Sequence, residues 1–279
     1  MNCPNCQTYN PGDAMYCAQC GVVVPTQEQG MENWQERVSQ AYLIAKNLSG
    51  ILIDTLEIYK ANFTVLLRIA LIGHAPIIAT AFVSNEAIVA SMFVASLFTS
   101  LLATAATTNA VGRYYLGYRV TASICYAMVL NDGVSLLVNG LLFYTAVLLA
   151  MVLSFFIVGI PLLVFVATTY FFYVQIIAIE RQGPMRAIVR SSQLVMGTWW
   201  RVFGIGCVYV TLLVAAGLLT SGAGRLIVEN VNPTFGILLT TIAGVFVVPF
   251  GYVGATLVYF DLRVRKEDYD METLASEIG

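Results

Sequence analysis

The sequence predicts an all-α membrane protein with six transmembrane helices, short interfacial amphipathic helices and a small folded segment at the N-terminus. Hydrophobic residues make up 58 % of the 279 residues and charged residues 11 %, and the mean hydropathy is +0.78. A soluble domain carries roughly 25 % charged residues. The composition therefore argues against an ordinary soluble enzyme or a disordered chain. The net charge of −2 also argues against a nucleic-acid partner bound by bulk positive charge.

The N-terminal segment, residues 1–33, is polar and carries a regular cysteine pattern, Cys-x2-Cys-x10-Cys-x2-Cys. Two residues between thiolates let one turn direct both sulfurs at one ion, and two such pairs complete a tetrahedral site. We therefore expect a zinc ribbon over residues 1–25, similar to those at the ends of many bacterial and archaeal proteins. The expected Zn2+ ligands are Cys3, Cys6, Cys17 and Cys20.

This zinc site is expected to be structural, because four cysteines leave no open position for a substrate. A segment of this length is too short to bury a hydrophobic core, and we therefore expect metal binding to drive its folding. The alternative to zinc binding is that these cysteines form two disulfides or remain free thiols. Residues 1–33 contain no Lys or Arg, which disfavours nucleic-acid binding by the ribbon.

Residues 26–33 are interpreted as a linker, and residues 34–62 as an amphipathic helix that precedes the membrane. Apolar residues recur there at three- and four-residue steps, which is the period of a helix with one apolar face. The face comprises Trp34, Val38, Tyr42, Ala45, Leu48, Leu52, Leu56 and Tyr59. Such a helix either lies along the inner membrane surface or packs on other cytosolic helices, and the pattern does not separate these alternatives.

The transmembrane domain is predicted to cover residues 63–260. A helix needs roughly 20 apolar residues to cross the hydrocarbon core. Gly159 and Pro161 divide one long apolar run into two spans, because proline interrupts helical hydrogen bonding. The six expected spans are residues 63–83, 87–108, 136–158, 160–179, 203–220 and 235–260.

The distribution of positive charge predicts the topology. An even number of spans places both termini on one side, and the first thirty residues lack the features of a secretory signal peptide. With the N-terminus inside, Arg225 alone among the 14 Lys and Arg residues falls in an outer loop, as the positive-inside rule requires. We expect a multi-pass protein of the cell (plasma) membrane with both termini cytosolic. Residues 261–279 would form a cytosolic tail.

The connection between the fourth and fifth spans predicts an interfacial amphipathic helix. Pro184 is suited to start this helix and Gly197 to end it, and Trp199 and Trp200 are suited to the headgroup level. Four arginines in this region either contact anionic lipid or act only as topology-setting charge, and the second interpretation is the simpler. They are Arg181, Arg186, Arg190 and Arg201.

Ionisable groups are scarce within the predicted spans. His74, the single histidine, is expected to be a buried neutral side chain bonded to a neighbouring helix rather than a proton relay. Asn139 and Gln175 are expected to bond between helices. The charged residues near the spans fall at helix ends, and no nucleophile elbow or phosphate-binding loop is present. We therefore predict no catalytic or cofactor-binding residues and no enzymatic activity.

The second span is expected to lie at the centre of the bundle, and a contact between copies of the chain is the weaker alternative. Small residues at four-residue steps let neighbouring helices approach closely, and their hydroxyl groups can bond across the contact. The row comprises Ala87, Ser91, Ala95, Thr99, Ala103 and Thr107.

Three segments together resemble a known membrane domain. They are LEIYKANFTVLLRIAL at 56–71, AIVRSSQLVMGTWWRVFGI at 187–205 and YFDLRVRKEDYDMETL at 259–274. They resemble the membrane domain associated with some glycerophosphodiester phosphodiesterases, which also occurs in uncharacterised six-helix bacterial and archaeal proteins. The resemblance covers roughly residues 50–275 and departs at Ser192, where an aromatic residue is expected. It implies architecture only, because the phosphodiesterase activity belongs to a separate TIM barrel of about 250 residues.

The expected function is that of a non-enzymatic integral membrane protein whose ribbon acts as a docking or regulatory module. Its partners would be the lipid bilayer and a cytosolic or membrane protein. The alternative is a transporter or lipid-handling protein that uses the six-helix bundle. Proline and glycine in the spans would then permit the broken helices found in transporters, or equally form kinks without a function. These residues are Pro76, Gly159, Pro161, Pro249 and Gly251.

Overall fold

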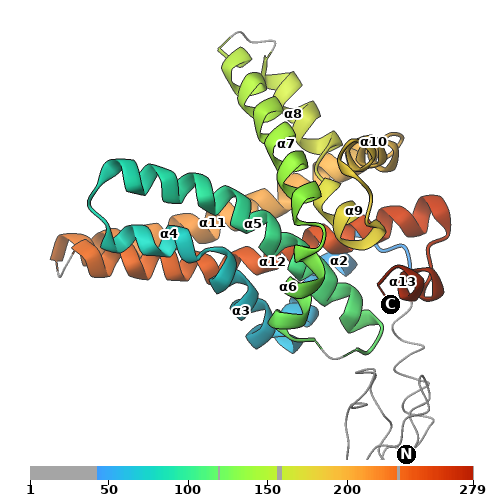
Figure 1. Ribbon diagram of the computed structural model, residues 1–279, viewed down its shortest axis with the longest axis horizontal. Coiled ribbons are helices and arrows are strands. Elements are labelled where there is room, and N and C mark those ends of the chain that lie inside the picture. The colour runs from blue at the N-terminus through green and yellow to red at the C-terminus, as the bar shows by residue number, and fades with distance from the viewer. Residues whose placement is uncertain (1–42, 119, 156–158, 231–232, 279) are drawn as a thin grey trace, which may run out of the picture.

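The computed structural model describes residues 43–118, 120–155, 159–230 and 233–278, and all the regular secondary structure in these residues is helical (Figure 1). This confirms the predicted helical class for that part of the chain. The helices are α2 (Leu48–Ala61), α3 (Phe63–Gly73), α4 (Ala75–Ala79), η1 (Thr80–Phe82), α5 (Glu86–Tyr115), α6 (Ala122–Leu130), α7 (Gly133–Leu153), α8 (Gly159–Thr169), α9 (Tyr173–Glu180), α10 (Pro184–Val195), α11 (Trp199–Asn230), α12 (Pro233–Glu267) and α13 (Met271–Ile278).

Within the described residues, five helical segments are long and apolar enough to cross a membrane, and a sixth results if a bent pair counts as one span. The bent pair is Phe63–Gly73 with Ala75–Phe82, whose axes differ by 63°. Each of the six predicted stretches coincides with one of these segments. The structure is therefore consistent with a multi-pass membrane protein.

The helices form two arms that meet in a hub (Figure 1). The first arm contains α4 and the neighbouring parts of α5, α11 and α12. The second arm is the α7–α8 hairpin, which points away from the first. The hub contains α2, α6, α9, α10 and α13, together with the ends of α3, α5, α7, α11 and α12 that meet them.

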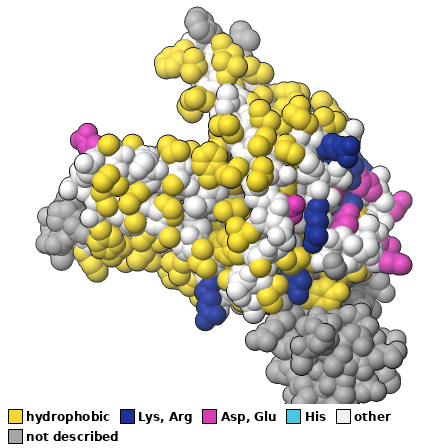
Figure 2. All heavy atoms as spheres, viewed as in Figure 1, with side chains coloured by type: hydrophobic (Ala, Val, Ile, Leu, Met, Phe, Trp, Pro, Cys, Tyr) yellow, Lys and Arg dark blue, Asp and Glu magenta, His cyan; other side chains and the backbone are white. Residues whose placement is uncertain are grey.

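Burial differs sharply between hub and arms. In the hub, every side chain from Tyr173 to Ile179 in α9 is buried. In the arms, large apolar side chains are exposed, including Leu148 in α7 and Leu219 in α11. Exposed apolar side chains are stable where lipid rather than water surrounds them. Charge follows the same division: the Lys and Arg side chains visible in Figure 2 lie over the hub or at its border with the first arm.

The second span packs closely only at its hub end. Residues 105–112 of α5 are all buried, and the Thr108 hydroxyl lies 3.1 Å from the Thr256 hydroxyl of α12. Ala87, Ser91 and Ala95 are exposed at the other end. The predicted central packing is thus confirmed for the hub half and wrong for the arm half, where the two arms diverge.

The fourth span is broken between α8 and α9. Ser191 of α10 lies in the break, where its hydroxyl accepts from the Phe172 amide at 3.2 Å and donates to the Thr169 carbonyl at 2.9 Å. A side chain that enters the helical hydrogen-bond ladder is a common cause of a break. The break fixes α10 against the junction, and the chain reverses after α9 at Arg181, whose φ is 50°.

Both ends of the described chain add helices to the hub. The pre-membrane helix, expected from residue 34, begins within the described part at Leu48, where the Asn47 side chain accepts from the Gly50 amide at 2.8 Å. Residues 43–47 are not helical. After α12, the segment expected to be a tail forms α13, which buries Leu274 and Ile278. Helix α6 was not predicted from the sequence.

Candidate functional site

The expected zinc ligands lie outside the described residues. Cys3, Cys6, Cys17 and Cys20 all precede residue 43, so the zinc ribbon stays a prediction. Among the residues that the structure describes, no group of three or more His, Cys, Asp or Glu side chains is placed to hold a metal ion. The candidate site in the described chain is therefore a set of charged side chains in the hub.

The first group of charges, the Glu180 cluster, joins four hub helices. It consists of Glu180 from α9, Arg190 from α10, Tyr259, Arg263 and Glu267 from α12, and Tyr269 and Glu277 from the C-terminal segment. Glu180 ends its helix with a side chain only 8 % exposed. Its carboxylate accepts from Arg190 Nε and from the Tyr259 hydroxyl, both at 2.9 Å.

Arg263 lies at the centre of this cluster, with a side chain 6 % exposed. Its two terminal nitrogens donate to the two oxygens of Glu277 at 2.7 and 2.9 Å. Such paired hydrogen bonds fix the relative orientation of the two groups. The guanidinium also lies 3.6 Å from the centre of the Tyr269 ring, a cation–π contact. Arg263 thereby attaches α13 to α12.

The electrostatic environment favours the charged form of the arginine in α10. Burial lowers the pKa of Arg190, but hydrogen bonds to Glu267 and Glu180 outweigh this effect and raise it above its ordinary value. Burial, followed by the hydrogen bond to Glu277, raises the pKa of Tyr269. Each carboxylate of the cluster already has a guanidinium or phenol partner. This arrangement favours holding helices together over supplying a free acid or base.

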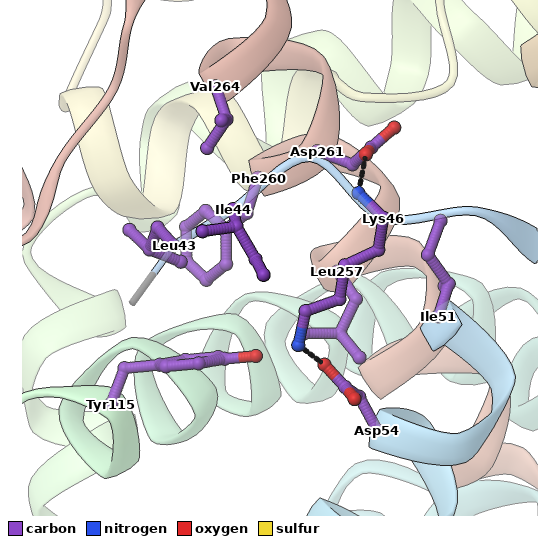
Figure 3. Close-up of a pocket in the computed structure, with 10 residues that line it drawn as sticks. All are labelled: Leu43, Ile44, Lys46, Ile51, Asp54, Tyr115, Leu257, Phe260, Asp261 and Val264. Carbon is purple, nitrogen blue, oxygen red and sulfur yellow. Dashed lines mark hydrogen bonds and ion pairs between the residues drawn. The ribbon is translucent and has the colours of Figure 1, made fainter. Parts of the chain in front are cut away.

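The second group of charges, the Asp261 clasp, holds the segment that precedes α2 (Figure 3). The Asp261 side chain of α12 is 3 % exposed. Its carboxylate accepts from Arg201 Nη2 at 2.9 Å and from Arg265 Nε at 3.0 Å. It also accepts from the backbone amide of Lys46 at 2.7 Å.

Lys46 is held by both of its backbone groups. Its amide donates to Asp261, and its carbonyl accepts from Arg201 and from Arg265, the latter at 2.9 Å. Its side chain turns the other way and pairs with Asp54 of α2 (Figure 3). The clasp therefore fixes the chain at residue 46 to α11 and α12, immediately after residues 1–42.

A small hollow lies beside the clasp, between the segment at Leu43 and Ile44 and the side chains of Tyr115 and Phe260 (Figure 3). Its volume is about 20 Å³. A cavity needs a volume of roughly 10–15 Å³ to hold one water molecule. The hollow therefore has room for about one water and is too small for an organic substrate.

His74 lies at the bend of the first span, between α3 and α4. Its Nδ1 is 2.9 Å from the Ala70 carbonyl, and its Nε2 is 3.4 Å from the Tyr252 hydroxyl of α12. The ring is half-buried and stacks on Tyr252. The contact with a neighbouring helix agrees with the sequence-based expectation. The ring links α12 to the bend.

The buried amides do not bond as expected. Asn139 Nδ2 donates to the Ser135 carbonyl of its own helix. The side-chain oxygens of Asn139 and Gln175 have no hydrogen-bond partner among the described residues. Cys125 is buried, which raises the pKa of its thiol to about 11, whereas Cys207 is exposed on α11. Neither cysteine belongs to the charged groups of the hub.

The sequence pattern does not indicate the contacts that several hub residues make. Glu180 and Asp261 were recognised only as acids at helix ends. The spacing of Arg263 and Glu267 is typical of a helical ion pair and was a usable signal. No local sequence pattern indicates the roles of Ser191 and of the Lys46 backbone, because these roles depend on contacts with residues far away in the sequence.

Comparison of the sequence with protein families and with curated proteins, and of the structure with solved structures, finds no match. The resemblance to the membrane domain of glycerophosphodiester phosphodiesterases therefore stays a prediction.

Proposed function

We propose that this chain is a non-enzymatic membrane protein that holds a cytosolic zinc ribbon at the membrane surface, where the ribbon docks another protein. The Asp261 clasp is the observation that carries the proposal. Backbone hydrogen bonds at Lys46, which lies 26 residues after the last ribbon cysteine, Cys20, tie the chain to α11 and α12. A docking module gains from such an anchor, because a fixed attachment point limits the space that the module explores.

The proposed topology has six spans, with the hub and both termini in the cytosol. The concentration of Lys and Arg over the hub supports this orientation. The partners of Glu180, Glu267 and Glu277 support a structural rather than a catalytic role for the buried charges.

A transporter is the competing function, and the bend at His74 is the observation that favours it. Transport requires a polar cavity near mid-membrane depth. The hollow beside Lys46 and Asp261 in the hub, with a volume of about 20 Å³, is too small to hold a transported solute.

The zinc content of the purified full chain tests the first part of the proposal. We expect one zinc per chain, because four thiolates complete a tetrahedral site. Zinc should disappear in the Cys3→Ser/Cys6→Ser variant and remain in the matched Cys125→Ser/Cys207→Ser variant. A wild-type chain without zinc, or equal zinc in both variants, would end the ribbon hypothesis.

Affinity capture with the same variants tests docking. Partners that require the ribbon should be recovered with the wild type and with Cys125→Ser/Cys207→Ser. They should be missing with Cys3→Ser/Cys6→Ser and with a chain that lacks residues 1–25. Identical partner lists from all four chains would contradict the docking function, whatever the zinc content.

A further inference from the structure

Helix α10 has two faces of different character. The buried face carries Ala187, Ser191, Leu194 and Val195. The opposite face exposes Met185, which is 68 % exposed, and Val189. The spacing of four residues places Met185 and Val189 on one side of the helix, and Met196, which is also exposed, directly follows the last helical residue. Large apolar side chains that project from an already packed helix are typical of a surface that contacts lipid or another protein.

A further large apolar side chain, Trp200, is exposed four residues after Met196. It lies at the start of α11 and is 77 % exposed, whereas the neighbouring Trp199 donates to Thr169 and stacks on Phe203. Helix α11 continues from this point into the first arm (Figure 1). An exposed tryptophan where a span begins is typical of the headgroup level of a bilayer.

The four arginines around α10 fall into two pairs. Arg190 and Arg201 are held inside the hub by Glu180 and Asp261. Arg181 and Arg186 are exposed, and neither forms an ion pair with any residue in the described ranges. These two positive charges are therefore available next to the apolar face.

We infer that the exposed surface of α10 and of the residues that flank it lies on the bilayer and binds anionic phospholipid headgroups. This surface comprises Met185, Arg186 and Val189 of α10, Arg181 before it, and Met196 and Trp200 after it. Its apolar side chains enter the boundary between headgroups and acyl chains, and the two guanidinium groups pair with lipid phosphates. Charge complementarity favours an anionic headgroup over a zwitterionic one, by about fivefold for each arginine near the surface.

Lipid-specific fluorescence quenching tests this inference. The full chain, with Trp34→Phe to remove one of the 3 tryptophans, is placed in nanodiscs of phosphatidylcholine and phosphatidylglycerol. Brominated acyl chains, which quench tryptophan on contact, are carried by one lipid or the other at equal total bromine. A parallel Trp200→Phe variant gives the background from Trp199. We expect Trp200 to be quenched at least about twofold more strongly by brominated phosphatidylglycerol.

Matched variants identify the source of the preference. Arg181→Gln/Arg186→Gln should bring the quenching ratio to one, and Arg181→Lys/Arg186→Lys should retain most of it. Lys60→Gln/Arg68→Gln removes the same charge from exposed sites on α2 and α3 and should leave the ratio unchanged. Because Arg181, Arg186, Lys60 and Arg68 are exposed, the thermal stability of each variant in detergent serves as the folding control.

Three results would overturn the inference. The first is equal quenching of the wild type by the two lipids. The second is an equal loss of preference in the Lys60→Gln/Arg68→Gln variant, which would mean a response to net charge alone. The third is a Trp200 that aqueous acrylamide quenches and neither lipid does, because the face would then be open to water and to a protein partner.

Discussion

The two halves of the fourth span, α8 and α9, show how differently the arms and the hub are stabilised. Both halves are apolar, yet α8 exposes Ile160, Leu162 and Phe165 while all side chains from Tyr173 to Ile179 in α9 are buried. The break held by Ser191 separates them. Apolar composition alone therefore does not tell whether a residue faces lipid or protein. The hub should depend on specific contacts, whereas the arms should tolerate substitution.

The largest contrast is expected from the buried charges. Arg263→Met should lower the free energy of unfolding in detergent by about 3–5 kcal/mol, because Glu277 would lose its paired guanidinium and Glu267 would keep, among the described residues, only Arg190 as a cationic partner. Arg186→Met removes an exposed arginine and should change the free energy of unfolding by less than about 0.5 kcal/mol. Similar values for the two variants would show that the Glu180 cluster does not stabilise the hub.

A leucine pair compares hub and arm directly. Leu194 in α10 is 1 % exposed and Leu148 in the second arm is 60 % exposed. Leu194→Ala should lower the free energy of unfolding by about 2–5 kcal/mol, since it leaves a cavity. Leu148→Ala should cost no more than about 0.5 kcal/mol. Denaturant titrations of the two variants in one detergent provide the measurement, and a larger loss for Leu148→Ala would reverse the comparison.

A serine pair tests the break in the fourth span. Ser191→Ala should cost about 1–3 kcal/mol, because the buried Phe172 amide and Thr169 carbonyl lose their partner. The hydroxyl of the neighbouring Ser192 donates to the Val189 carbonyl of its own helix, so Ser192→Ala should be nearly neutral. Thermal unfolding of both variants gives the comparison, and equal midpoints would mean that Ser191 does not hold the break.

Much of the fold was predictable because membrane spans leave strong signals. Six apolar stretches located the spans, and Pro184 and Gly197 bracketed α10, which ends just before a Gly197 with φ of 85°. The break between α8 and α9 was not predictable, because residues 170–172 contain no glycine or proline and the cause lies about 20 residues away in α10. Periodicity shows which face of a helix is apolar, not which partner it meets.

The charged groups of the hub were predictable only as individual residues. Lys46 and Asp261 lie 215 positions apart, and no local pattern indicates that the backbone of one meets the side chain of the other. The same holds for Glu180 and Tyr259, which lie 79 positions apart. These contacts depend on how α9, α11 and α12 pack, so they became visible only in the structure.

Cysteine labelling in intact cells tests most directly the central claim, that the hub lies in the cytosol and the arms cross the membrane. Glu86 begins α5 at the far end of the first arm, and Glu272 is exposed on α13 in the hub. A membrane-impermeant maleimide should label Glu86→Cys in intact cells and Glu272→Cys only after permeabilisation, relative to the unsubstituted chain. Labelling of Glu272→Cys in intact cells, with Glu86→Cys protected, would contradict the account.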